Sequence, residues 1–180
     1  LELGQTLFGC IEGMELCKAL LERCPVSWPT LDLRQVAWTG VDISPLFNRL
    51  APLLHADYSV TTHDNAALLE PHYNVFFAKG VTLLYAVRTV DELFSLITRS
   101  DLALFDYSLS LGEEQQVVIG TGKPAVYLPL SDFLAACRSA GGQLCIKRGN
   151  SRIDPASGRI WLDAVYGDND LCRSFTDLDS

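Results

Sequence analysis

The group that most clearly offers chemistry is Asp42, a single acid near the end of the mostly apolar run Gln35–Ile43. A Ser-Pro pair and the amphipathic stretch Leu46–His55 follow it. This pattern predicts a buried strand with a carboxylate at its carboxyl end, and then a helix. Ligands of open α/β sheets lie outside the carboxyl ends of the strands. A carboxylate there can accept hydrogen bonds from both hydroxyls of a ribose; the alternative is that Asp42 only caps the helix.

Glycines come before this strand. Leu1–Gly4 indicates the end of an earlier strand and the start of a turn, Gly9 and Gly13 follow, and a helical run reaches Cys24. A strand, a glycine-bearing turn, a helix, a second strand and an acid, in this order, are typical of the first half of a nucleoside-cofactor site.

Three further groups at the ends of predicted strands offer acid–base chemistry. His63 is a candidate general base with Asp64 as the group that orients it, because histidine titrates near neutral pH. Lys79 is a charge at the end of an apolar strand, where it lies near the site or extends its ammonium group into solvent. Asp106 closes another apolar run, so it points into the same cleft or caps the next segment.

The segment Gly120–Pro124 contains a Gly-Lys pair but is not a P-loop. That motif needs a glycine where this chain has Val117, and a serine or threonine where it has Pro124. We expect a loop over the site instead, with Lys123 and Tyr127 contacting substrate; a plain surface loop is the alternative.

A positive cluster lies near the end of the chain, formed by Lys147, Arg148 and Arg152. These side chains would bind a phosphate or carboxylate of a substrate. The alternative is a solvated strand edge whose charges block pairing with another strand. Nearby Trp161 is expected to anchor the core or an interface.

Composition limits the classes of function. The chain has 180 residues, 48% of them hydrophobic and 20% charged, with a net charge of -8. We expect one domain over residues 1–180, truncated at its amino terminus because it starts at Leu1, with an acidic tail at 168–180. The acids from Asp163 to Asp179 are expected to lie in a solvated terminus. The sequence has no stripe of basic residues of the kind that binds nucleic acid. It also has no apolar run long enough to predict a membrane span.

The cysteines and histidines do not show a metal-binding pattern. Cys10, Cys17 and Cys24 are seven residues apart, about 10 Å per step along a helix, which is too far for a disulfide or a shared metal. His55, His63 and His72 form no ligand spacing either. We therefore expect reduced thiols, no metal and a cytoplasmic protein without a secretory signal.

Apolar runs and turn formers predict alternating strands and helices. The expected strands end near Leu3 and cover Val36–Ile43, Tyr58–Thr62, Tyr73–Phe77 (reaching Ala78) and Leu102–Phe105. The expected helices cover Ile11–Arg23, Pro45–Leu54, Ala66–Glu70, Asp91–Ser100 and Ser131–Ala140, the last with Ser131 as N-cap and Gly141 as its stop.

The carboxyl-terminal part changes character. Gln143–Arg148 and Arg159–Tyr166 alternate like half-buried strands, and turn formers fill Asn150–Gly158 between them. The fold class expected is α/β: a Rossmann-like, mostly parallel sheet that ends in an antiparallel hairpin, with helices on both faces.

This order of elements resembles the class I S-adenosylmethionine-dependent methyltransferases over nearly the whole chain. The resemblance implies that Glu2 and Gly4 open the cofactor loop and that Asp42 binds the ribose. It implies that Asp64, with Asn65 beside it, binds the adenine amino group. It also places the end of the fourth strand, Ala78 included, beneath the sulfonium.

The resemblance implies S-adenosylmethionine as cofactor and methyl transfer to a small-molecule acceptor, of the kind seen in sugar O-methyltransferases. Two alternatives stay open. Gly4 is followed by Gln5–Phe8 where the family has more glycines, which favours a catalytically inactive scaffold or protein-interaction module. The second alternative is a nicotinamide-dependent reductase. The missing GxGxxG motif and the terminal antiparallel hairpin count against this alternative.

Overall fold

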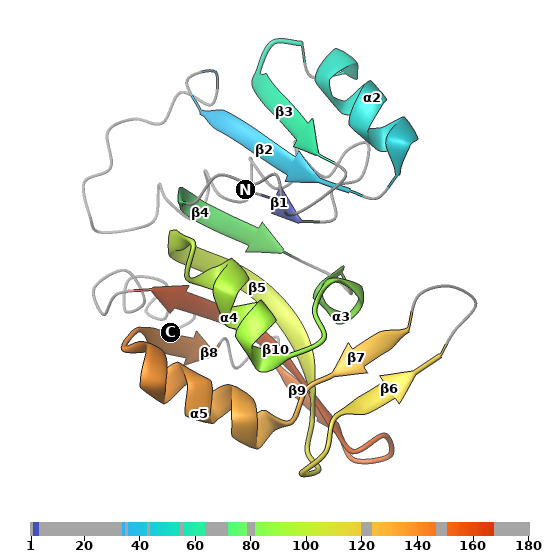
Figure 1. Ribbon diagram of the computed structural model, residues 1–180, viewed down its shortest axis with the longest axis vertical. Coiled ribbons are helices and arrows are strands. Elements are labelled where there is room, and N and C mark those ends of the chain that lie inside the picture. The colour runs from blue at the N-terminus through green and yellow to red at the C-terminus, as the bar shows by residue number, and fades with distance from the viewer. Residues whose placement is uncertain are drawn as a thin grey trace. The chain divides into compact units, whose positions relative to one another are not determined.

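The computed structural model describes residues 2–3, 34, 36–42, 44–54, 56–63, 72–78, 82–119, 124–146 and 151–167 (Figure 1). The chain divides into two compact units, Leu1–Tyr73 and Asn74–Ser180. The predicted helices at Ile11–Arg23 and Ala66–Glu70 and the acidic tail at 168–180 lie outside the described residues.

The first unit holds a parallel sheet in the order β3-β2-β1. Its strands are β1 (Glu2–Leu3), β2 (Ala37–Val41) and β3 (Ser59–His63). Leu3, Val41 and His63 are register partners across the three strands. The carboxyl ends of these strands are therefore level, so the residues that follow them meet at one edge of the sheet.

Helix α2 (Pro45–Leu54) packs against β3 although it contains Pro52. Proline has no amide hydrogen, so the carbonyl of Asn48, four residues earlier, receives no helical hydrogen bond from it. The Thr62 hydroxyl donates to that carbonyl at 2.8 Å instead. The bond links α2 to β3. On the sheet itself Trp38 is buried against Val60 and neighbouring apolar groups.

The second unit holds strands in the order β4-β5-β10-β8, and β9 also pairs with β10. These strands are β4 (Tyr73–Ala78), which begins at the boundary between the units, β5 (Ser100–Ser110), β8 (Gln143–Ile146), β9 (Arg152–Asp154) and β10 (Arg159–Gly167). β10 is antiparallel to both β5 and β8. The predicted antiparallel pairing of the last two long strands is thus confirmed.

The described residues of this unit include the helices α3 (Thr82–Ala86), α4 (Val90–Ile97) and α5 (Leu130–Ala140). In Figure 1, α4 lies in front of β5, and α5 lies below β8. Phe133 of α5 contacts Phe94 of α4 and Phe105 of β5, with ring centroids 5.8 and 6.5 Å apart. These aromatic contacts hold the helices to the sheet, because large rings bury the most apolar area.

The ends of these helices follow capping rules with one correction. The Thr89 side chain accepts a hydrogen bond from the Glu92 amide and caps α4. The prediction that Ser131 caps α5 is wrong: the helix begins one residue earlier and Pro129 takes the cap position without a side-chain bond. Gly141 ends α5 with φ of 75°, as predicted, because glycine adopts this conformation without a steric cost.

Several strands are longer or more numerous than predicted. β5 continues to Ser110, so the prediction that it ends at Phe105 is wrong. The strands β6 (Gln116–Val118) and β7 (Ala125–Tyr127) form an antiparallel hairpin where a loop was expected. β9 lies within the stretch that was expected to form only turns. In Figure 1 the β6–β7 hairpin projects to the right of β5.

Asp163 is also corrected by the structure. It was expected to begin a solvated terminus, but it lies within β10 and is 9% exposed. Two cysteines agree with the expected core thiols, since Cys137 and Cys145 are buried and free. No helix in the described ranges is long and apolar enough to cross a membrane.

Candidate functional site

In the first unit, Asp42 lies where the sequence predicts, directly after β2. Its amide donates to the His63 carbonyl at 3.1 Å, which fixes it against the end of the neighbouring strand. The Asn48 side-chain amide donates to the Asp42 carbonyl at 2.7 Å. Both bonds act on the backbone, so strand β3 and helix α2 together hold the position of this residue without using its carboxylate.

The Asp42 carboxylate makes one local bond: Oδ1 accepts from the Ser44 amide at 2.7 Å. This is the short turn that leads into α2, in which Ser44 accepts weakly from the Phe47 amide at 3.5 Å. Within the part of the chain that the structure describes, Oδ2 accepts no hydrogen bond. Asp42 therefore stabilises the turn before α2, while Ser44 stands at the cap position that the alternative gave to Asp42. One oxygen of the half-buried Asp42 carboxylate stays available to a ligand.

His63 is the last residue of β3, half-buried and level with Val41. Because β3 is the outer strand of β3-β2-β1, His63 is a neighbour of Asp42 and lies two strands from β1. Its proposed part as a base stays a prediction. Of Glu2, the structure describes only the backbone, which lies opposite Gly40 of β2. Gly4, Asp64, Asn65 and Lys79 lie outside the described residues.

In the second unit, Ala78 ends β4 as predicted and is 1% exposed. Asp106 does not end its strand; the prediction failed because β10 pairs with β5 over the whole stretch from Leu102 to Ser110. Asp106 is buried directly opposite Asp163 of β10. Side chains of register partners lie on the same face, so the two carboxylates lie side by side.

The two faces of β5 differ in character because successive side chains alternate. Phe105, Tyr107 and Leu109 face the helices, as the contact of Phe105 with Phe133 of α5 shows. Asp106 and Ser108 lie on the other face. There, Ser108 is the register partner of Trp161, which in turn pairs with Arg152 of β9.

A pocket of about 440 Å³ opens on this second face near the carboxyl end of β5. Its lining comes from α3, β5, β7 and the β9–β10 hairpin and includes Leu84, Ser108, Tyr127, Arg152, Arg159 and Trp161. The carboxyl end of a strand is the ligand-binding end of an α/β sheet, and this volume suits a small molecule. Asp106 lies one pleat from Ser108 on the same face.

Two residues of this pocket were predicted to contact substrate or an anion, Tyr127 and Arg152, and the structure brings them together. Lys123, Lys147 and Arg148, predicted beside them, lie outside the described residues. Arg159 and the half-buried Trp161 were not predicted to line a site. The alternation Arg159, Trp161, Asp163 on one strand face is the signal that identifies them.

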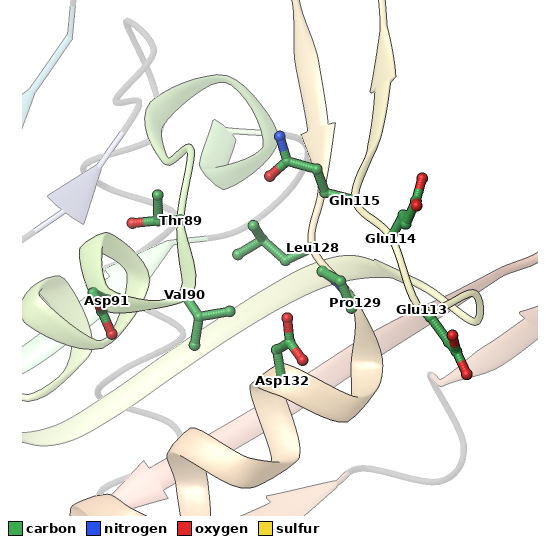
Figure 2. A pocket seen from close by; sticks show the side chains of 9 residues that line it. All are labelled: Thr89, Val90, Asp91, Glu113, Glu114, Gln115, Leu128, Pro129 and Asp132. Carbon is green, nitrogen blue, oxygen red and sulfur yellow. The ribbon is translucent and has the colours of Figure 1, made fainter.

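A second hollow, of about 470 Å³, lies where α4 and α5 begin (Figure 2). Figure 2 shows Asp132 directed from α5 toward Val90 and Leu128, while Glu113 and Glu114 point away from it. Asp91 and Asp132 occupy first turns, where a carboxylate stabilises the positive end of a helix. That structural role accounts for the two acids.

No group of three or more His, Cys, Asp or Glu side chains is placed to hold a metal ion within the described ranges. The first unit thus offers an acid at the end of β2, and the second unit offers a pocket at the end of β5.

Comparisons with known proteins give matches in structure. No protein-family model matches the chain, and no curated protein matches it in sequence. The crystal structure of the N-terminal domain of EvdMO1 with SAH bound matches with a TM-score of 0.59 at 15% identity, over 93% of this chain and 72% of that one. The same domain in the presence of SAH and D-fucose gives 0.60 at 15%, over 93% and 74%.

A putative S-adenosylmethionine-dependent methyltransferase from Listeria monocytogenes matches with a TM-score of 0.57 at 11% identity, over 93% of this chain and 90% of that one. At these identities the likeness establishes the fold. The antiparallel β10 between β5 and β8 also argues against the reductase alternative, since doubly wound dehydrogenase domains end in parallel units. The chain has the fold of the class I methyltransferases, as the sequence resemblance implied.

Proposed function

Starting from the class I methyltransferase fold, we propose that this domain binds S-adenosylmethionine and directs methyl transfer to a small-molecule acceptor, a hydroxyl group of a sugar-like compound. One solved domain with this fold, the N-terminal domain of EvdMO1, has been determined with SAH bound and in the presence of SAH and D-fucose. At 15% identity these neighbours support the class of reaction and leave the acceptor to this chain's own residues.

Asp42 is the observation that carries the proposal. It lies at the carboxyl end of the middle strand of β3-β2-β1, and its backbone is fixed by bonds to His63 and from Asn48. Of the two carboxylate oxygens, only Oδ1 accepts a hydrogen bond within the turn. A ribose hydroxyl can donate to Oδ2, and a second one can share Oδ1, because each carboxylate oxygen accepts more than one bond.

When bound, the cofactor supplies an electrophilic methyl group on a positively charged sulfur. The chain's part is to hold the nucleoside, align the acceptor, exclude water and receive the acceptor's proton. Asp42 holds the ribose. Of the predicted acid–base residues that the structure describes, Asp106 lies on the face of β5 where Ser108 lines the pocket. We therefore assign proton acceptance to Asp106 in preference to His63.

Calorimetric titration of the chain with S-adenosylhomocysteine tests this function. We expect micromolar affinity with one ligand per chain. A folded sample that shows no heat of binding at millimolar ligand would contradict the proposal and favour the scaffold alternative. Circular dichroism on the titrated sample verifies that it is folded.

The proposed proton acceptor is tested by Asp106→Asn, which preserves the size of the side chain but replaces one acceptor oxygen by an NH₂ group that cannot take up a proton. We expect S-adenosylhomocysteine affinity to stay the same and methyl transfer to fall, because the nucleoside contacts do not involve β5. Equal activity of the variant and the parent chain over pH 6–9 would show that Asp106 is not the base.

A further inference from the structure

Two arginines line the pocket at the end of β5 in a chain whose net charge is -8. Arg159 is half-buried at the start of β10, and Arg152 is exposed on β9. Within the described residues, neither guanidinium has a carboxylate within ion-pair distance. Cations concentrated in one pocket of an acidic molecule point to a negatively charged ligand.

Two uncharged groups hold the Arg159 guanidinium in place. Its Nε donates to the Gln116 side chain at 2.9 Å, and its central carbon lies 3.7 Å from the centroid of the Tyr127 ring. Gln116 and Tyr127 are register partners in the β6–β7 hairpin. A neutral amide and an aromatic face thus orient the group, while its two terminal nitrogens are free of hydrogen bonds to described residues.

Asp154 of β9 is the register partner of Arg159 and also lines the pocket, but its carboxylate is engaged in its own turn. The Ser157 hydroxyl donates to its Oδ2 at 2.6 Å and the Ala156 amide donates to its Oδ1 at 3.1 Å. These hydrogen bonds, the one from Ser157 above all, hold the pKa of the Asp154 carboxyl below its usual range. The positive charge of Arg159 on the neighbouring strand lowers this pKa further, so the two groups attract each other. They do not come within ion-pair distance, and the terminal nitrogens of Arg159 therefore stay available to a ligand.

We propose that this pocket binds the methyl acceptor and that the acceptor carries a carboxylate or phosphate attached to a ring. Arg159 and Arg152 bind the anionic group, and the ring packs against Trp161 and Leu84. The assignment of the ligand as the acceptor rests on the proposed methyl transfer; the preference of the pocket for a ring-bearing anion does not.

The shape and lining of the pocket support a ring. Its volume of about 440 Å³ is near the lower end for small-molecule sites. Trp161 is half-buried, so part of its indole is available for contact, and Leu84 adds an apolar surface from α3. Arginine recognises carboxylate and phosphate by paired hydrogen bonds, for which two unused terminal nitrogens are required.

The test compares matched probes by ligand-observed nuclear magnetic resonance on the intact chain. The probes are 4-hydroxybenzoate, its neutral isostere 4-hydroxybenzamide, and phenyl phosphate. We expect the benzoate to bind about tenfold more tightly than the amide, as charge-assisted bonds to arginine require. Comparison of benzoate with phenyl phosphate then distinguishes a carboxylate from a phosphate. Equal affinity for benzoate and amide would overturn the proposal.

Two variants locate the binding. Arg152→Gln removes an exposed charge that has no described contact, so the fold should be unaffected, and we expect benzoate affinity to fall about threefold. Arg159→Gln should reduce it about tenfold, whereas Arg159→Lys, which keeps the charge, should lose less. Arg138→Gln on the exposed end of α5 is the control and should change nothing. Unchanged benzoate affinity in both glutamine variants would refute the assignment.

The two proposals fail in different ways. If S-adenosylhomocysteine binds but the anionic probes show no preference, only the acceptor class is wrong. If the anionic probes bind at the arginines but S-adenosylhomocysteine does not bind, the pocket is an anion site and its part in methyl transfer is refuted.

Discussion

Replacing Asp42 by asparagine separates its two roles. The amide oxygen of asparagine can still accept from the Ser44 amide, as Oδ1 does at 2.7 Å, so the turn into α2 is preserved. The other atom becomes an NH₂ group, which donates hydrogen bonds and cannot accept one from a ribose hydroxyl. The variant also removes the charge that strengthens both ribose bonds.

The expected loss follows from this count. A hydrogen bond to a charged group contributes about 1.5–3 kcal/mol, and the variant removes one acceptor together with the charge. We therefore expect the dissociation constant for S-adenosylhomocysteine to rise about 10- to 100-fold, since about 1.4 kcal/mol is tenfold in affinity. Asp42→Ala should weaken binding at least as much and also lower stability by about 1 kcal/mol through the lost turn.

The assay is calorimetric titration with thermal unfolding as a check of folding. Asp57→Asn is the matched control: it makes the same change in an exposed turn before β3, at the opposite end of that strand from His63. Unchanged affinity in a folded Asp42→Asn protein would refute the ribose assignment. An equal loss in Asp57→Asn would do the same, because the effect would then be one of net charge.

Three further predictions concern the second unit. Gly142→Ala should lower the free energy of unfolding by roughly 1–3 kcal/mol, because a Cβ there would lie 2.4 Å from the Tyr166 ring; urea denaturation measures it. Tyr107→Phe should cost roughly 1–3 kcal/mol in the same assay, since it removes the buried 2.8 Å bond from the hydroxyl to the Val126 carbonyl. Burial raises the pKa of Cys137 to about 11, so at pH 8 its alkylation, followed by peptide mass mapping, should be about 100-fold slower than that of the unfolded chain.

Matched controls limit these predictions. Gly112→Ala places its Cβ 3.5 Å from the nearest atom, an ordinary contact, and should leave the unfolding midpoint in place. Tyr85→Phe removes the hydroxyl of an exposed tyrosine and should have no effect on it either. Alkylation of Cys137 at the rate measured in 8 M urea would show that its thiol is not shielded. If Gly112→Ala shifted the unfolding midpoint as much as Gly142→Ala, the contact with Tyr166 would not be the cause. If Tyr85→Phe shifted it as much as Tyr107→Phe, the bond to Val126 would not be the cause.

The first unit illustrates which elements the sequence predicts well. β2 lies inside the predicted run, and α2 occupies its predicted range, Pro45–Leu54. Apolar runs with polar ends define both elements, and the Ser-Pro pair defines the helix start. The bond from Thr62 to the Asn48 carbonyl, by contrast, depends on the pairing of α2 with β3 and has no signature in either segment alone.

β5 illustrates why the second unit was predicted less well. Its apolar run is interrupted at Asp106, which indicated a strand end, yet every second residue up to Leu109 remains apolar. Pairing with β10 over this whole length makes both faces buried. The polar residues Asp106 and Ser108 lie on the face opposite the helices. The break in the apolar run therefore reflects polar side chains on that one face, and it does not end the strand.

The same alternation explains why half of the candidate site could be predicted. Asp42 depends on a single strand end, which a sequence displays directly. The arginine pocket gathers Ser108, Tyr127, Arg152 and Arg159 from four strands, and only the register of β10 with β5 and β9 brings them to one face. A carboxylate at a strand end is thus a local property, while the position of Arg159 in a pocket arises from tertiary pairing. The proposed nucleoside anchor can therefore be predicted from the sequence, whereas the proposed acceptor class depends on the fold.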